Sequence, residues 1–185
     1  MALPDYSITY TDPRGRASNF FRYVLAIPHV FIMQAWQALA QVLTIVQWFI
    51  ILFTGKRNRG IWDMQNSWLG YAARVWSYYG LMYDKWPNIG PQPAGEPTSY
   101  SFEYEESANR LTNFFRFIWI IPTAIVAVFV VIGAAVCTIL TWFAILFTGR
   151  HPRGLFDFMA RTHTFMVRVE SCLLLMSDTR PKFGA

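Results

Sequence analysis

The segment Trp142–Phe158 reads WFAILFTGRHPRGLFDF, and an earlier segment, Trp48–Met64, reads WFIILFTGKRNRGIWDM. The two segments are 94 positions apart, since 142 − 48 = 94, and they share one order of features. Each has an apolar run, a Thr-Gly step, a group of basic residues, and then Gly, an apolar residue, an aromatic residue and Asp. Glycine commonly ends a helix because it tolerates the left-handed conformation there. The pattern therefore predicts, twice over, an apolar helix, a basic turn and the start of a second helix.

The same offset of 94 aligns the rest of the chain without a gap. Matching positions include Ser7 with Ser101, Asn19-Phe20-Phe21-Arg22 with Asn113-Phe114-Phe115-Arg116, Ile27-Pro28 with Ile121-Pro122, Arg74 with Arg168, Asp84 with Asp178, and Pro87 with Pro181. Self-similarity at one fixed period indicates internal duplication, and this unit is far longer than a solenoid repeat. We therefore predict two tandem modules, 1–90 and 100–185, joined by a linker at 91–99 that is rich in Pro and Gly and is expected to be extended and unstructured.

The composition is that of a membrane protein. Of the 185 residues, 54% are hydrophobic and 18% are aromatic, whereas only 15% are charged, against about 25% in an ordinary soluble domain. The net charge of +5 does not indicate nucleic-acid binding, because the basic residues stand in short groups beside apolar runs. The N-terminal segment is polar, so we expect no cleaved secretory signal.

Two windows are long enough to cross a bilayer. No Asp, Glu, Lys or Arg occurs between Arg22 and Lys56, or between Arg116 and Arg150, and about 20 apolar residues suffice to span the hydrocarbon core. Pro28 and Pro122 near the start of each window suggest a kink that separates an interfacial first part from a spanning part.

The segments 61–83 and 155–177 allow two interpretations. Their polar residues step by three or four positions, which places a polar stripe on an otherwise apolar helix. Such a helix could lie in the membrane interface, or it could return across the bilayer. Because the two basic turns have matching charge, and basic loops prefer the cytoplasm, we favour the second. The predicted fold is an all-α membrane protein of two helical hairpins, with four spans and with short β-strands in YSITY (6–10) and SYSFEYEE (99–106) that pair about a pseudo-twofold axis.

The phrases FRYVLAIPH and WFAILFTGRHPRGLFDF, with the module ends LMYDKWPNIG and LMSDTRPKFG, carry a family resemblance. The chain resembles a widespread bacterial membrane-protein family that is known only as a domain of unknown function. The second basic turn fits the family pattern best, whereas Asn58 in the first turn and Thr123 in the second module depart from it. The resemblance implies an integral membrane protein and indicates no activity.

Several residues are candidates for a site. The first basic cluster (Lys56, Arg57, Arg59) and the second basic cluster (Arg150, His151, Arg153) could hold anionic lipid headgroups or a partner's acidic patch, or they could serve topology alone. Arg74 and Arg168 lie near the middle of their helices, where Asp63, Asp157 or Glu170 could offset their charge. His29 could in principle bind a haem or chlorin, although a lone His is more often held by water or backbone.

The two apolar windows differ in their polar residues. Gln34, Gln37 and Gln41 form a stripe along one face of the first window, whereas the second module has Val128, Val131 and Ala135 there. The glutamines therefore predict a face that packs on protein, either the module's own second helix or another subunit. Gly133 and Cys137 form a small-residue face suited to close helix packing.

We find no catalytic grouping and no metal-ligand spacing in the sequence, and we expect no enzyme activity and no cofactor. The expected function is that of an accessory or scaffold subunit that packs on a larger membrane protein complex and contacts anionic lipid. The alternative is a protein that binds or helps to transport a lipid or small molecule in a cavity between the modules. We expect it in the bacterial cytoplasmic membrane, with both basic clusters on the cytoplasmic side.

Overall fold

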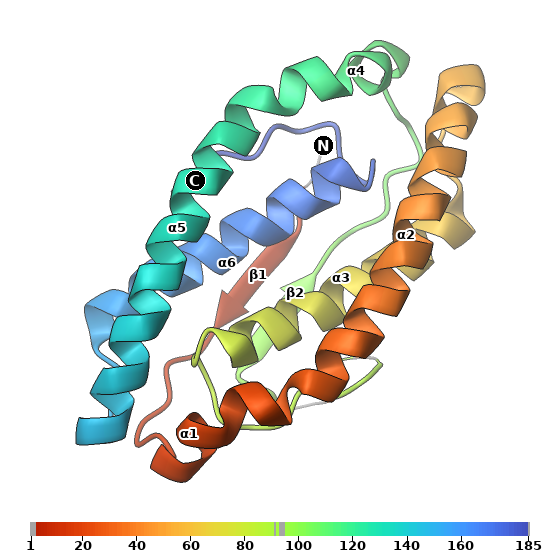
Figure 1. Cartoon of the computed structure of the whole chain (residues 1–185). Helices are drawn as coiled ribbons and strands as arrows, with labels where there is room; N and C mark the ends of the chain where they lie inside the picture. Colours follow the sequence, from red (N-terminus) through yellow and green to blue (C-terminus); the bar gives the residue numbers. More distant parts are fainter. Residues whose placement is uncertain (1–2, 91, 93–94, 185) are drawn as a thin grey trace.

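The computed structural model describes residues 3–90, 92 and 95–184. The chain forms strand β1 (Asp5–Ile8) and helices α1 (Arg16–Leu25), α2 (Ile27–Thr54) and α3 (Arg59–Tyr79), and then repeats this order. The second set is β2 (Thr98–Ser101), α4 (Arg110–Phe114), α5 (Arg116–Thr148) and α6 (Arg153–Leu173), as Figure 1 shows. The protein is thus mostly helical with one two-stranded sheet, as predicted.

Local sequence explains where the helices end. Gly55 and Gly149 follow α2 and α5 with φ angles of +72° and +70°, the left-handed conformation predicted for the Thr-Gly steps. Asn58 caps α3, because its side-chain oxygen accepts the backbone N–H of Ile61. Pro28 lies in the first turn of α2, after the break at Ala26, but Pro122 lies inside α5, which continues through it. The second module therefore breaks at Phe115, before the proline rather than at it.

The two repeats are related by a pseudo-twofold axis. Strands β1 and β2 pair antiparallel, and Tyr6 lies opposite Tyr100, its own repeat equivalent. An axis between these two tyrosines, perpendicular to the sheet, exchanges the modules. The predicted strand pairing is confirmed.

This symmetry makes α2 and α5 antiparallel, as their colours in Figure 1 show. The Asn19 side chain donates to the carbonyl of Trp142 at 3.1 Å, and the Asn113 side chain donates to the carbonyl of Trp48 at 3.1 Å. The start of each module is therefore held by the end of the other module's long helix. Four spans with both basic clusters on one side of the membrane require α2 and α5 to run in the same direction, and this arrangement is wrong. The two basic clusters lie at opposite ends of the molecule.

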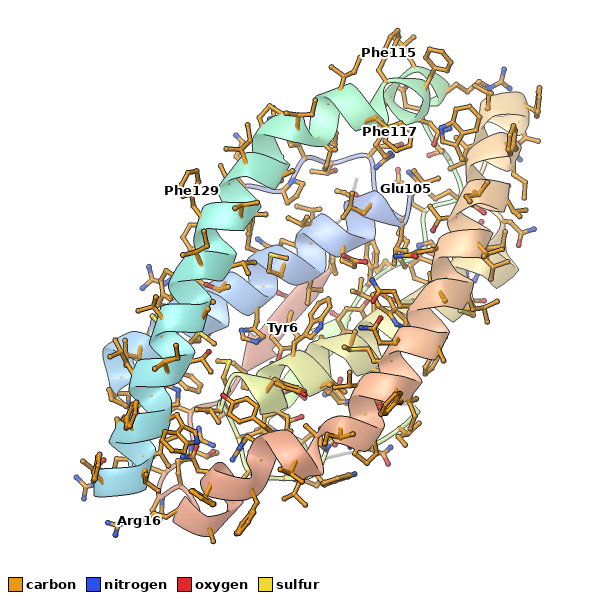
Figure 2. The ribbon with its side chains drawn as sticks, in the orientation of Figure 1. Tyr6, Arg16, Glu105, Phe115, Phe117 and Phe129 are labelled. Carbon is orange, nitrogen blue, oxygen red and sulfur yellow. The ribbon has the colours of Figure 1, made fainter. Side chains whose placement is uncertain are left out.

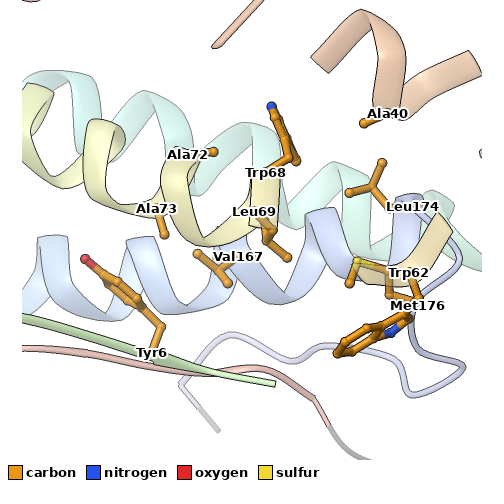
Figure 3. Close-up of a cluster of buried hydrophobic side chains, with 10 residues drawn as sticks. All are labelled: Tyr6, Ala40, Trp62, Trp68, Leu69, Ala72, Ala73, Val167, Leu174 and Met176. Carbon is orange, nitrogen blue, oxygen red and sulfur yellow. The ribbon is translucent and has the colours of Figure 1, made fainter. Parts of the chain in front are cut away.

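The elements form three layers. Figure 3 shows α2 above, α3 and α6 in the middle, and the strands below. A cluster of buried side chains, including Tyr6, Trp68, Leu69 and Val167, joins the middle layer to the other two. Helices α3 and α6 pack on each other, on α2 and α5 respectively, and on the strands.

The upper layer leaves its apolar side chains uncovered. Among the described residues, the exposed large hydrophobic side chains of the helices belong to α1, α2, α4 and α5, apart from Leu173 at the end of α6. In Figure 2, Phe129 projects outward from α5. We call this outward surface of α1, α2, α4 and α5 the apolar layer. By length and composition, α2 and α5 could cross a membrane, whereas α3 and α6 do not pass that test among the described residues, so the structure does not show four spans.

Candidate functional site

The glutamine stripe, Gln34, Gln37 and Gln41, lies within the apolar layer. Gln34 and Gln41 are exposed and Gln37 is half-buried, and none of the three forms a hydrogen bond within the described part of the chain. The next polar residues along α2 are used internally. The Gln65 side chain donates to the Thr44 hydroxyl at 2.8 Å, and the Asn58 N–H donates to the Gln47 side chain at 3.2 Å. The side chains of the stripe therefore form no hydrogen bonds with α3, the module's own second helix.

An apolar cleft of about 480 Å³ lies between α2 and α5 and includes Gln41 in its wall. Its other lining residues are Thr44, Ile45, Trp48, Phe49, Arg116, Phe117, Ile120, Leu173 and Leu175. At the offset of 94, Phe117 and Leu173 correspond to Tyr23 and Tyr79. These two tyrosine rings contact each other, with centroids 5.7 Å apart, so the equivalent region of the first module carries a pair of larger side chains.

The small-residue face of α5 is occupied by the protein itself. A side chain at Gly133 would meet the Phe158 ring of α6 at 3.1 Å. Cys137 packs against the cluster of Phe156 and Met159, also on α6. Gly133 and Cys137 therefore form the interface within a module rather than an outer surface.

In the first basic cluster, one residue is buried in an ion pair and two lie at the surface. Arg57 is 3% exposed and lies 2.9 Å from the carboxylate of Asp178, while its guanidinium also donates to the carbonyls of Leu175, Glu105 and Ser107. Lys56 is exposed and pairs with Glu106 at 2.8 Å, and Arg59 pairs with Asp63 at 3.0 Å. Arg57 thus links the modules and offers no free charge to a headgroup.

The second basic cluster is divided in the same way. His151 is 1% exposed and contacts the Phe156 ring, and burial lowers the pKa of its imidazole to about 4. The guanidinium of Arg153 lies over the Tyr10 ring at 3.5 Å from its centroid. Arg150 is exposed. The side chains of the two clusters that remain at the surface are Lys56, Arg59, Arg150 and Arg153.

The carboxylate partner expected for Arg74 is wrong. Arg74 lies 3.9 Å from Glu96 and donates to the carbonyls of Asn88 and Gly90. Asp63 pairs with Arg59 instead. Arg168 donates to the carbonyl of Pro4 at 3.3 Å, and Asp157 is exposed at the surface of α6. Glu96 lies in the predicted linker and pairs with Arg74, and Thr98 and Ser99 of the same segment belong to β2, so this part of the segment is not the unstructured connector that its composition suggested.

Two carboxylates that the sequence analysis did not single out organise the molecule. Asp178 accepts from Arg116 at 2.6 Å and lies beside Arg57, while its repeat equivalent Asp84 accepts from Arg22. Arg116 also donates to the carbonyls of Cys172 and Ser177. Both repeats have this Arg and this Asp at equivalent positions, Arg22 and Asp84 in the first and Arg116 and Asp178 in the second. This shared pair was the sequence feature from which the ion pairs could have been predicted.

His29 is enclosed rather than open to a ligand. Its ring is 1% exposed, its Nδ1 lies 2.6 Å from the Tyr71 hydroxyl, and Trp86 packs on it with ring centroids 4.7 Å apart. A haem or chlorin at His29 would have to displace Trp86. No group of three or more His, Cys, Asp or Glu side chains gathers in a metal-binding arrangement within residues 3–90, 92 and 95–184.

Comparison with known families matches both copies of this architecture. The family model described as domain of unknown function DUF4389 matches residues 16–88 and, again, residues 110–185. The chain belongs to the DUF4389 family. The predicted resemblance to a two-copy family of unknown function is confirmed, and each DUF4389 match covers one α-helical unit from α1 to α3 or from α4 to α6. Strands β1 and β2 lie outside the matched ranges. No curated protein and no solved structure matches the chain.

Proposed function

We propose that this DUF4389 protein is a non-catalytic accessory or scaffold subunit of a membrane protein complex, and that the glutamine stripe of α2 is its docking face. The observation that carries the proposal is the position of Gln34 and Gln41, which are exposed among apolar side chains with no hydrogen-bond partner in the described chain. An amide in hydrocarbon is unfavourable unless another polar group meets it. A helix of a partner subunit that lies along α2 and carries polar side chains would form hydrogen bonds with the glutamine side chains of the stripe.

The size of the apolar layer supports a membrane location. Soluble monomers rarely expose contiguous apolar patches larger than a few hundred Å², and here exposed Phe, Ile, Leu and Val side chains follow α2 and α5 along their length. At 28 and 33 residues, these helices are about 42 and 50 Å long. Hydrocarbon or the apolar surface of a partner would cover this layer.

We further propose that the apolar layer lies flat in one leaflet. Among the described residues, neither outer edge of the two-stranded sheet has a neighbouring strand. Side chains of Gln92 and Thr164 bond some of the backbone groups of the strands, but unpaired backbone groups are not tolerated in hydrocarbon. If α2 and α5 crossed, the sheet at the centre of the repeat pair would sit near the middle of the bilayer. A flat orientation keeps the sheet outside the membrane. It also allows both basic clusters to face the cytoplasm, although α2 and α5 are antiparallel.

Labelling of single cysteines at Asn58 and Pro152 tests the orientation, because each position lies within one basic cluster. We expect a membrane-impermeant reagent to label both positions in inverted vesicles, which expose the cytoplasmic face, and neither position in intact cells. Labelling from opposite sides would mean that α2 and α5 cross, and would refute the flat orientation.

Exchange of the stripe for its repeat equivalents tests the docking face. The triple variant Gln34→Val, Gln37→Val, Gln41→Ala carries residues that α5 already has at these positions. Interhelical hydrogen bonds in membranes contribute about 0.6 kcal/mol each, so we expect several-fold weaker co-purification of the partner and an unchanged melting temperature. A shifted melt with unchanged association would show that the stripe stabilises the chain itself.

The apolar cleft favours a second candidate, a protein that holds a lipid chain. The cleft lies within the apolar layer and has a volume of about 480 Å³, within the range of about 300–1,000 Å³ that is common for small-molecule sites. The double variant Phe117→Tyr, Leu173→Tyr introduces the residues of the first module and should fill the cleft. Loss of co-purified lipid in this variant, with the partner retained, would support lipid binding over docking.

A further inference from the structure

Each repeat has a cavity between its mid-helix arginine and the facing strand. In the second repeat the cavity has a volume of about 290 Å³, and Arg168, Thr164 and Tyr6 lie in its wall. In the first repeat it has a volume of about 470 Å³, and the equivalent residues Arg74, Gly70 and Tyr100 lie in its wall. The two cavities are therefore one feature present twice, and their charges can be compared position by position.

The cavity of the first repeat is electrically balanced by the chain. Arg74 has the carboxylate of Glu96 at 3.9 Å, and the two side chains are 3% and 1% exposed. Two further residues at or near this cavity, Ser67 and Asn88, are neutral. One buried cation thus has one buried anion.

The cavity of the second repeat has gained positive charge. Ser67 corresponds to Arg161 and Asn88 corresponds to Lys182, so Arg161, Arg168 and Lys182 all line it. No Asp or Glu is among the described residues that line it. Arg161 and Lys182 are exposed and form no ion pair with any residue in 3–90, 92 or 95–184. The added positive charges of Arg161 and Lys182 repel each other, and a bound anion would remove that repulsion.

The polar groups of this cationic pocket suit a phosphate. Arginine presents a planar fork of donors that matches phosphate oxygens, and lysine adds a point charge. The exposed Ser7 hydroxyl also lines the pocket and can donate to a phosphate oxygen, whereas the Thr164 hydroxyl donates its proton to the carbonyls of Tyr6 and Ala160, each at 3.0 Å. Phe165 and Ile8 provide an apolar wall beside the charges. We propose that the cationic pocket of the second repeat binds a phosphate group, of either a small phosphorylated molecule or a lipid headgroup.

Exchange of the added cations for their repeat equivalents tests the proposal. The variant Arg161→Ser, Lys182→Asn carries the residues of the first repeat, and both positions are exposed, so the unliganded protein should melt as the wild type does. The control variant Lys85→Asn, Arg16→Ser removes the same two charges at exposed positions that lie outside the pocket and outside both basic clusters. Binding of inorganic phosphate to the full chain in an uncharged detergent is measured by titration calorimetry. Each cation near an anionic group contributes about 1 kcal/mol, so we expect affinity to fall about tenfold or more in the pocket variant and to change little in the control.

A second arm separates the two sources of phosphate. Phosphatidylcholine vesicles with and without phosphatidic acid are titrated with the same three proteins. Pocket-dependent binding of inorganic phosphate indicates a small phosphorylated ligand, whereas pocket-dependent binding of phosphatidic acid alone indicates a headgroup. Equal loss in the pocket and control variants would show attraction by net charge and would overturn the proposal, as would no binding of either probe. If the double variant does not fold, Arg161→Ser alone must still weaken binding several-fold, and unchanged affinity would overturn the proposal.

Discussion

Replacement of Asp178 by Asn tests whether one buried carboxylate joins the two DUF4389 repeats. The Asp178 side chain is 3% exposed and lies 2.9 Å from Arg57 of the first module and 2.6 Å from Arg116 of its own module. It also accepts the backbone N–H of Asn109 at 2.9 Å. Asn keeps the size of the side chain but removes the charge. Two guanidinium groups that are 1% and 5% exposed then remain without a counter-ion. Removal of one partner from a buried ion pair costs about 3–5 kcal/mol, so we expect a loss of at least that size.

The repeat provides a matched control in Asp84→Asn. Asp84 pairs with Arg22, but its side chain is 30% exposed, and the position equivalent to Arg57 is His151. Arg14 also interacts with Asp84, but not within ion-pair distance, and water around the Asp84 carboxylate should limit the loss to about 1–3 kcal/mol. Unfolding is followed by circular dichroism in mixed micelles as a denaturing detergent is added. Equal losses for the two variants, or a loss below about 1 kcal/mol for Asp178→Asn, would refute the argument that this carboxylate neutralises both arginines.

Three further predictions concern single positions. Gly55→Ala should destabilise the protein by about 1–2 kcal/mol, because Gly55 has φ +72° and an added Cβ would lie 3.0 Å from Arg110 Nε. Gly154→Ala is the control and should be neutral or stabilising, because an added Cβ would have no atom within 4 Å. Equal melting temperatures for the two variants would contradict this prediction. Arg74→Leu should cost about 3–5 kcal/mol by leaving the buried Glu96 unpaired, and Arg74→Leu with Glu96→Gln should recover part of that loss in the same unfolding assay. Burial raises the pKa of Glu170 from 4.5 to about 7, so the unfolded chain loses this proton first and stability should fall by up to about 3 kcal/mol as pH rises from 4.5 to 7. His151, with a lowered pKa, acts in the opposite direction over part of this window, so the test is the difference between wild type and Glu170→Gln, which should grow with pH and would be flat if Glu170 were solvated.

Local chemistry made part of the fold predictable. The Thr-Gly steps located the ends of α2 and α5, because glycine is suited to the left-handed conformation at a helix end. The alternating residues of YSITY and SYSFEYEE predicted strands, and the duplication predicted their pairing about a twofold axis. These features depend on a few neighbouring residues or on the repeat itself, and both can be read from one sequence.

The direction of the modules was not predictable in this way. The expectation of parallel modules came from the charge of the basic clusters, on the assumption that the long helices cross the membrane. What sets the direction is a set of contacts between distant residues, such as Asn19 with Trp142, and no local pattern shows that these residues meet. The same reason applies to Arg57, whose carboxylate partner Asp178 lies in the other module, and to Arg74, whose partner Glu96 lies in a segment with the composition of a linker.

The contacts between the modules imply that neither repeat is a complete folding unit. The N–H of Arg14 donates to the carbonyl of Gly149, and the N–H of the equivalent Ala108 donates to the carbonyl of Gly55, both at 2.9 Å. Each helix end is thus covered by the segment that precedes the other module's first helix. Among the described residues, strand β1 pairs only with β2, so without the second repeat its ladder groups would have no backbone partner within the protein. The first repeat alone would also leave Arg57 without Asp178. The duplication therefore supplies by covalent linkage what a single repeat would need from a second copy.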